Sequence, residues 1–253
     1  MRAIKNIAIL IIASCSLPAI ADDGSSVTPY RPSVSSPAQL PAPGQLELEL
    51  GGLSTKTNEE RRDSLPYQFK LAFSENWGIL LGGDAYVWQR DPNNRISGFG
   101  DTSLTLKRAF LIDDRTAFGL EFTSRMPSSK SGLGNTKADY TLNGIFSKDI
   151  GDFHLDLNLN TTRIGAPDAG TGRSQTGISS SLSTSLSEKW GVVGELSGTH
   201  QSGTPNNAQF LTALTYSPSK RMTIDFGLAK GLNKDSPDWA VFTGIVVPIA
   251  NFW

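Results

Sequence analysis

The chain has 253 residues, with 23 basic and 24 acidic side chains and two histidines, and its formal net charge is −1. This length fits one large domain or two small ones, and the balanced charge gives no electrostatic indication of nucleic-acid binding. The single cysteine, Cys15, excludes a disulfide framework. Two histidines provide no metal-ligand spacing, and the glycine pair in residues 132–134 precedes no helical pattern, so we expect neither a metal ion nor another cofactor.

The first 21 residues are organised as a secretory signal peptide. A positively charged start precedes an apolar stretch at residues 7–13 and an A-x-A cleavage site at residues 19–21. The apolar stretch is too short to span a bilayer. We therefore expect export and cleavage after Ala21. A lipoprotein-like box at residues 12–15, with Cys15 as the acylated residue, is the alternative.

Residues 22–43 form a second segment of distinct composition. They contain five prolines and several serines, and they show no hydrophobic periodicity. Such composition is typical of an extended linker, which predicts a periplasmic leader. The alternative is that this segment folds into the interior of the domain that follows it.

From residue 44 to residue 253 the apolar residues recur at every second position almost everywhere. In residues 46–50, 153–159 and 222–228 each apolar side chain is followed by a polar or small one. This alternation gives each strand one apolar and one polar face. No sustained helical period and no later run of eighteen apolar residues occurs, which excludes helical membrane spans. Twelve strands are expected, at residues 45–53, 66–74, 77–88, 99–111, 115–126, 138–148, 152–163, 176–187, 190–201, 207–217, 221–230 and 238–251.

The connections between these strands alternate in length. Long polar connections are expected at 54–65, 89–98, 127–137 and 164–175, and tight ones at 75–76, 112–114, 149–151, 188–189 and 218–220. An even strand number with alternating long loops and short turns is typical of bacterial outer-membrane barrels. The fold class predicted for residues 44–253 is all-β, a single closed antiparallel transmembrane barrel of about twelve strands with both termini in the periplasm.

Alternation alone does not tell whether the apolar face meets lipid or a buried core, so a soluble β-sandwich is the competing fold. Aromatic residues gather beside the tight turns and again near the long loops, as at two membrane interfaces. The chain also ends on Trp253, and a terminal aromatic on an amphipathic last strand resembles the signal that outer-membrane assembly machinery reads. One residue does not fit: the strand alternation turns the side chain of Arg108 towards lipid. Its long side chain could snorkel and place the charge at the rim of the barrel.

Twelve charged residues are expected to line the lumen, because they lie on the inward parity of their strands. Two interpretations stay open: a network of salt bridges that fills a narrow lumen, or a solute path with an acidic excess and weak cation preference. The acids are Glu47, Glu49, Asp84, Glu121, Asp139, Asp156, Glu195 and Asp225, and the bases are Lys70, Lys107, Arg125 and His154.

Catalytic motifs are nearly absent, and we predict that the chain is not an enzyme. One arrangement provides an alternative. His200 and Ser202 lie two positions apart near an extracellular rim, which resembles the dyad of outer-membrane phospholipase A. The match covers three residues, and no third group that would orient the histidine is identifiable from the sequence.

Several stretches, in order along the mature chain, resemble a family of outer-membrane transporters named after the meta-pathway of phenol degradation. They are residues 41–47, 98–102, 148–156, 194–198 and 237–239. The resemblance implies a barrel that passes small, often hydrophobic or aromatic compounds, and it carries over no functional residues.

The predicted function is a passive channel of the outer membrane of a Gram-negative bacterium. The partners expected are a small-molecule solute, outer-membrane lipid and lipopolysaccharide, and the barrel-assembly machinery. A lipid hydrolase with the His200/Ser202 dyad and a sealed structural or adhesive barrel are the alternatives.

Overall fold

The computed structural model describes residues 24–253. The expected signal peptide, its cleavage site and Cys15 lie outside the described residues. Within residues 24–253 no helix is long and apolar enough to cross a membrane.

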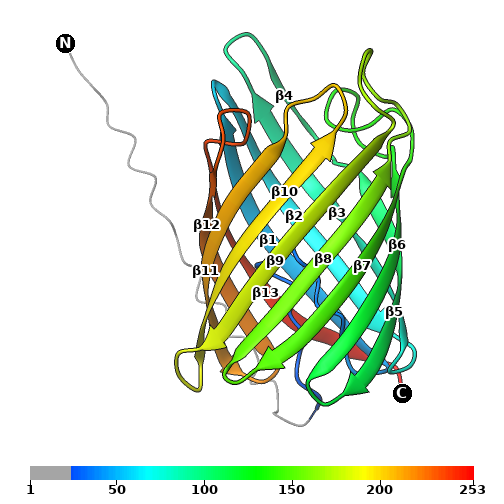
Figure 1. Ribbon diagram of the computed structural model, residues 1–253, viewed down its shortest axis with the longest axis vertical. Helices are drawn as coiled ribbons and strands as arrows, with labels where there is room; N and C mark the ends of the chain where they lie inside the picture. The colour runs from blue at the N-terminus through cyan, green and yellow to red at the C-terminus, as the bar shows by residue number, and fades with distance from the viewer. Residues whose placement is uncertain (1–23) are drawn as a thin grey trace, which may run out of the picture.

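The described chain forms one antiparallel sheet of thirteen strands that closes on itself through the pairing of β2 with β3 (Figure 1). The strands are β1 (Gln45–Thr57), β2 (Glu60–Ala72), β3 (Trp77–Arg90), β4 (Arg95–Gly98), β5 (Thr102–Asp113), β6 (Thr116–Met126), β7 (Asp139–Ile150), β8 (Phe153–Arg163), β9 (Ser174–Ser185), β10 (Trp190–Gln201), β11 (Asn207–Ser219), β12 (Met222–Gly231) and β13 (Trp239–Asn251).

Two of these strands occupy one position in the wall. β4 pairs with the upper part of β3, and β5 pairs with its lower part, so the barrel has twelve wall positions, as the alternation predicted. The expected strand at 99–111 is therefore wrong at its start. Residues 99–101 leave the ladder where the β2–β3 register shifts between Ser64 and Pro66, beside a proline that has no amide hydrogen to donate.

The first expected loop, residues 54–65, is also wrong. β1 and β2 continue as a hairpin to a turn at Asn58 and Glu59, and Asn58 has a φ of 54°. Asparagine accepts this left-handed conformation more readily than most residues. The alternation was not visible here because both faces of the hairpin are polar above the membrane.

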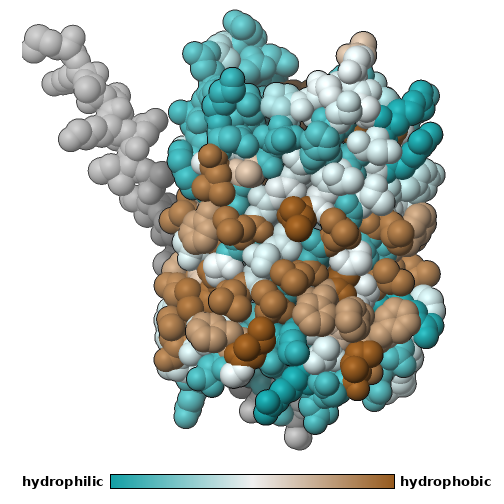
Figure 2. Space-filling model, viewed as in Figure 1, coloured by the Kyte–Doolittle hydropathy of each residue, from teal (hydrophilic) through white to brown (hydrophobic). Residues whose placement is uncertain are grey.

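The exterior of the barrel is apolar and its interior is polar. Leu104, Phe118 and Ile178 are 47%, 47% and 64% exposed, whereas the inward residues Lys70, Lys107 and Glu47 have no exposed surface. On the face shown in Figure 2 the apolar side chains form a band across the middle of the barrel, with hydrophilic surface above and below it. A soluble sandwich would bury that band, so this arrangement identifies a membrane-spanning barrel.

Aromatic pairs mark both edges of the apolar band. Near the short turns the Trp190 and Tyr216 rings lie 4.8 Å apart, and near the long loops the Tyr86 and Trp88 rings lie 4.7 Å apart. Amphipathic rings prefer the membrane–water interface, so these pairs place the two interfaces on the barrel.

The two ends of the barrel domain meet at the seam between β1 and β13. The amide of Phe252 donates to the carbonyl of Gly44 over 3.0 Å, and Trp253 is 65% exposed. We expect deletion of Phe252 and Trp253 to lower outer-membrane assembly sharply while export to the periplasm continues, because the closing strand loses its terminal aromatic. Cell fractionation measures this, with Phe252→Ala as the control that keeps Trp253. Normal surface assembly of the truncated chain would rule out the signal assignment.

Candidate functional site: a segment inside the lumen

Residues 27–40, called the plug below, lie inside the barrel rather than in the periplasm. The plug begins beside the β11–β12 turn, where the Val27 amide donates to the Lys220 carbonyl over 2.9 Å. Tyr30, Ser35 and Ala38 are 7%, 1% and 0% exposed. Of the two positions left open for this segment, the structure has the interior one. The expected periplasmic leader is therefore not what residues 27–40 form.

Carboxylates of the wall accept hydrogen bonds from the plug backbone. The amide of Thr28 donates to Glu47 over 3.0 Å, and the amide of Tyr30 donates to Glu49 over 2.7 Å. On the opposite wall Glu195 accepts from the amides of Val34 and Ser35 over 3.2 and 2.9 Å. Hydrogen bonds to an ionised acceptor are stronger than neutral ones, so these glutamates hold the plug in place.

Neutral wall groups serve the rest of the plug. Asn158 accepts from the Ser36 amide over 3.0 Å and donates to the Ser36 carbonyl over 2.9 Å. Ser147 accepts from the amide of Ala38 over 2.8 Å. A buried backbone without secondary structure needs such partners, and the inward side chains of the wall supply them.

The plug also brings a cation into the lumen. The guanidinium of Arg31 makes two hydrogen bonds to Asp225, of 3.0 and 3.1 Å, and Asp225 is 1% exposed. A third hydrogen bond, of 3.1 Å, reaches the carbonyl of Thr243. The bidentate geometry fixes the plug against β12 and β13. Sequence reasoning missed Arg31, and its only signal was a lone arginine in a segment of small polar residues and prolines.

Tyr30 is at the centre of the buried charges. The ammonium groups of Lys70 and Lys107 lie over its ring, at 4.2 and 4.1 Å from the ring centroid, and its hydroxyl donates to the Gln39 carbonyl over 2.7 Å. Burial, together with Glu121 and the other nearby carboxylates, raises the pKa of Tyr30 well above its ordinary value. The phenol therefore stays neutral and keeps the donor that ties one end of the plug to the other.

The charged residues expected at the lumen fall into three groups. Nine are buried, and five of these form one cluster around Tyr30, in which Lys70 pairs with Glu47 and Glu49 at 3.0 and 2.6 Å and Lys107 pairs with Glu121 at 3.0 Å. The other buried ones are Asp139, Asp156, Glu195 and Asp225.

Two of the remaining three lie towards the long loops and one lies at the opposite mouth. Asp84 pairs with Arg62 at 3.0 Å and Arg125 pairs with Asp101 at 3.1 Å, so both take part in ion pairs with residues that sequence reasoning did not select. His154 contacts Asp149 and Asp156 at 2.5 and 3.2 Å. The acidic side chains of the interior are thus largely paired with bases or with plug amides.

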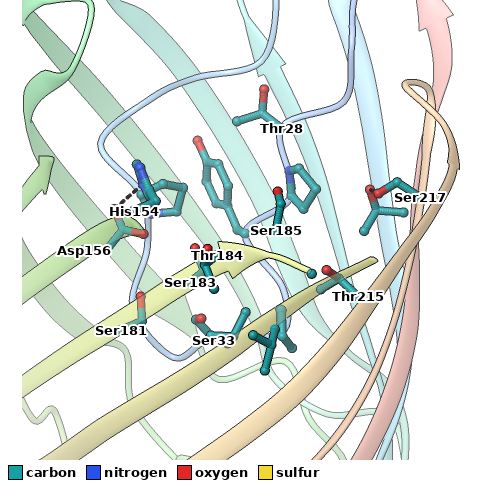
Figure 3. A pocket seen from close by; sticks show the side chains of 18 of the residues that line it. Thr28, Ser33, His154, Asp156, Ser181, Ser183, Thr184, Ser185, Thr215 and Ser217 are labelled. Atoms are coloured by element: carbon teal, nitrogen blue, oxygen red, sulfur yellow. Dashed lines mark hydrogen bonds and ion pairs between the residues drawn. The ribbon is translucent and has the colours of Figure 1, made fainter. Parts of the chain in front are cut away.

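The plug separates two cavities. The larger, of about 750 Å³, opens at the end with the short turns and is called the vestibule; its wall is rich in hydroxyls of β9 and β11 (Figure 3). The smaller, of about 320 Å³, lies against β2 and β3 and is lined by Glu49, Tyr67 and Gln68. Tyr30, Arg31, Ser33 and Ser35 line both cavities, so this stretch is the partition between them.

The comparisons with known proteins agree with this architecture. Residues 30–248 match the family described as "Putative MetA-pathway of phenol degradation". The chain belongs to this family. The match begins within the plug and ends in the last strand, so the plug residues from Tyr30 onwards are part of the family domain. A comparison with curated proteins found no match.

Solved structures of outer-membrane channels share the fold. The COG4313 outer membrane channel from Pseudomonas putida F1 is 13% identical, with a TM-score of 0.66 over 88% of this chain and 100% of that chain. The NanC porin is 8% identical, with a TM-score of 0.61 over 80% and 100%. The CymD monoaromatic hydrocarbon channel is 10% identical, with a TM-score of 0.50 over 83% and 90%. Together with the family and the apolar band, the closed barrel assigns this protein to the cell outer membrane.

Proposed function

We propose that this protein is an outer-membrane channel for the passive passage of small, uncharged solutes, aromatic compounds among them. The observation that carries the proposal is the pair of cavities on the two sides of the plug, inside a closed barrel. Passage from one cavity to the other requires displacement of the partition at residues 30–35. The plug is held by hydrogen bonds and ion pairs to side chains rather than by a strand ladder, which is consistent with a segment that can shift.

The charge arrangement favours uncharged solutes over ions. Lys70 and Lys107 pair with wall carboxylates, and Arg31 pairs with Asp225. An ion that enters a narrow passage loses hydration, and the passage must offer unpaired groups to replace it. Between the charged residues at its mouth and the plug, the wall of the vestibule also offers neutral hydroxyls from Ser181, Ser183 and neighbouring residues, which can bond hydroxyl-bearing solutes.

Two kinds of observation support aromatic compounds as solutes of the proposed channel. The family is described by a pathway of phenol degradation, and the CymD channel is named for monoaromatic hydrocarbons. In the partition itself an aromatic residue, Tyr30, is in the lining of both cavities.

A matched pair of solutes tests this function. Phenyl glucoside and phenyl glucuronide have nearly the same size, but only the second carries a carboxylate. We expect proteoliposomes that contain the full chain to swell several-fold faster in the glucoside than in the glucuronide, because ion entry requires desolvation. Protein-free liposomes are the control. Equal rates for the two solutes would contradict the proposed selectivity, and no swelling in either would favour the sealed structural barrel.

The alternative function, a lipid hydrolase, needs a group that orients His200 and a hydrogen bond between His200 and Ser202. Nδ1 of His200 contacts Oδ1 of Asn206 at 2.6 Å, so a group able to orient the histidine is present. Within the part of the chain that the structure describes, however, His200 makes no hydrogen bond to the hydroxyl of Ser202. A nucleophile must be within reach of its base. We therefore expect no phospholipid hydrolysis by this protein.

A further inference from the structure

Four basic residues form a single row across the outer surface of the barrel above its apolar band. The strand register pairs Lys56 of β1 with Arg61 of β2, Arg61 with Arg90 of β3, and Arg90 with Arg95 of β4. Directly paired residues project from the same face of a sheet. Ser64 of β2 and Val87 of β3 lie an odd number of positions from Arg61 and Arg90, so their side chains point to the other face of the sheet. Both are buried, at 4% and 0% exposure, so that face is the interior and the four basic side chains project outwards. These four residues are called the basic row.

Like charges in directly paired positions destabilise a sheet, and the basic row has little internal compensation. Asp63 pairs with Arg61 at 2.9 Å and with Arg90 at 3.7 Å. Within residues 24–253 no carboxylate forms an ion pair with Lys56 or Arg95. Two of the four cations of the row therefore have no carboxylate partner in the described chain and are available to an anion.

Most of the other acidic residues nearby are engaged elsewhere. Asp91 accepts from the amides of Asn93 and Asn94 in the β3–β4 turn, at 2.8 and 2.7 Å. Asp238 accepts from the amide of Asn58 over 2.9 Å, and Glu60 accepts from the inward-facing Gln89 over 2.5 Å. Glu59, at the tip of the β1–β2 turn, is the remaining acid in this region.

An aromatic platform lies directly below the basic row. Trp88 and Phe99 are 46% and 68% exposed, and Tyr86 lies between them with ring centroids at 4.7 and 6.0 Å. A hollow of about 310 Å³ borders the row and the platform, with Asp63, Trp88, Arg90 and Arg95 in its lining. From the loops downwards the surface is thus cationic, then aromatic, then apolar.

We propose that the basic row binds the phosphate groups of lipopolysaccharide in the outer leaflet. This order of surface chemistry matches an amphiphile whose anionic head lies above its acyl chains. The long connections place this end of the barrel outside the cell, where the outer leaflet presents a phosphorylated glycolipid. Arginine forks bind phosphate bidentately, and the aromatic platform below would pack against the sugar and the start of the acyl chains.

The test compares two variants of the full chain in detergent, titrated with lipid A. In Arg90→Gln/Arg95→Gln the row loses two charges that make no contact with the plug. Arg163→Gln is the matched control, because Arg163 is an exposed, outward-facing residue at the same end of the barrel, on β8, opposite Ser174. We expect the double variant to bind lipid A at least about tenfold more weakly, because each charge-assisted contact is worth more than a neutral hydrogen bond. The control should bind like the wild type.

Two further probes identify the source of the phosphate. Dephosphorylated lipid A should bind the wild type as weakly as lipid A binds the double variant, and equal binding of both lipids would overturn the proposal. Inorganic phosphate should not displace lipid A at millimolar concentration, and displacement would show a general anion site instead. Equal losses in the double variant and in Arg163→Gln would also overturn it, since they would indicate only net charge.

Discussion

Deletion of residues 27–40 is expected to raise the single-channel conductance of the purified barrel at least about tenfold, because the plug lies across the lumen between its two cavities. A twelve-stranded barrel has a backbone radius of about 12 Å, and the plug fills the part of it between the vestibule and the smaller cavity. The conductance is measured in planar bilayers, with the wild type in the same salt.

The deletion is also expected to make the pore prefer cations. It removes Arg31, which neutralises Asp225, and it removes the amides that donate to Glu47, Glu49 and Glu195. These carboxylates would then face water in an open lumen, where a net negative field enriches cations. The wild type, in which the same groups are paired, should show little preference in its reversal potential.

A reversible lock on the plug separates this effect from misfolding of the deletion variant. Oγ of Ser35 lies 2.9 Å from Oγ of Ser179 on β9, so Ser35→Cys/Ser179→Cys is placed to form a disulfide between plug and wall. We expect flux through this variant to fall under oxidising conditions and to recover after reduction. Ser179→Cys alone is the control and should not respond. If conductance were unchanged both by the deletion and by the lock, the partition at residues 30–35 would not control passage.

Lys70→Met is expected to lower the free energy of unfolding by about 3–5 kcal/mol, because it leaves buried carboxylates without their cation. Lys70 has no exposed surface, contacts Glu47 and Glu49 at 3.0 and 2.6 Å, and donates to the carbonyl of Thr28 in the plug. Methionine preserves most of the volume, so the loss would report the charge rather than a cavity. Urea unfolding in lipid vesicles measures it.

Arg125→Met is the matched control for this substitution. Its ion pair with Asp101 has a similar length, 3.1 Å, but the Arg125 side chain is 46% exposed and the amides of Ser129 and Asn135 also donate to Asp101. Asp101 is buried, but its two amide donors remain in the variant and water screens the exposed guanidinium, so we expect Arg125→Met to cost less than Lys70→Met. Equal losses in the two variants would contradict the buried cluster as a source of stability. Addition of Glu49→Gln to Lys70→Met should recover part of the loss, since one uncompensated charge disappears.

The wall of the barrel could be predicted from the sequence because its signal is local. Strand alternation has a period of two, so residues a few positions apart already decide which side chains face lipid and which face the interior. Phe153 and Leu159, at the two ends of one alternating stretch, are 47% and 66% exposed on the outer face, and nine of the twelve charges expected to face inwards are buried. The same parity marked Arg108 as a misfit. In the structure its guanidinium lies 4.8 and 4.7 Å from the Trp77 and Phe110 ring centroids, among the periplasmic aromatics.

The position of the plug, and the partners of the inward charges, were decided only by the tertiary structure. Residues 27–40 have no periodicity, and their contacts join positions far apart in the chain: Tyr30 with Glu49, 19 residues away, and Arg31 with Asp225, 194 residues away. Parity alone shows that Glu195 points inwards. Only closure of the barrel around the segment provides the amides of Val34 and Ser35 that occupy its carboxylate, because a hydrogen bond depends on distances in space and not on spacing in the sequence.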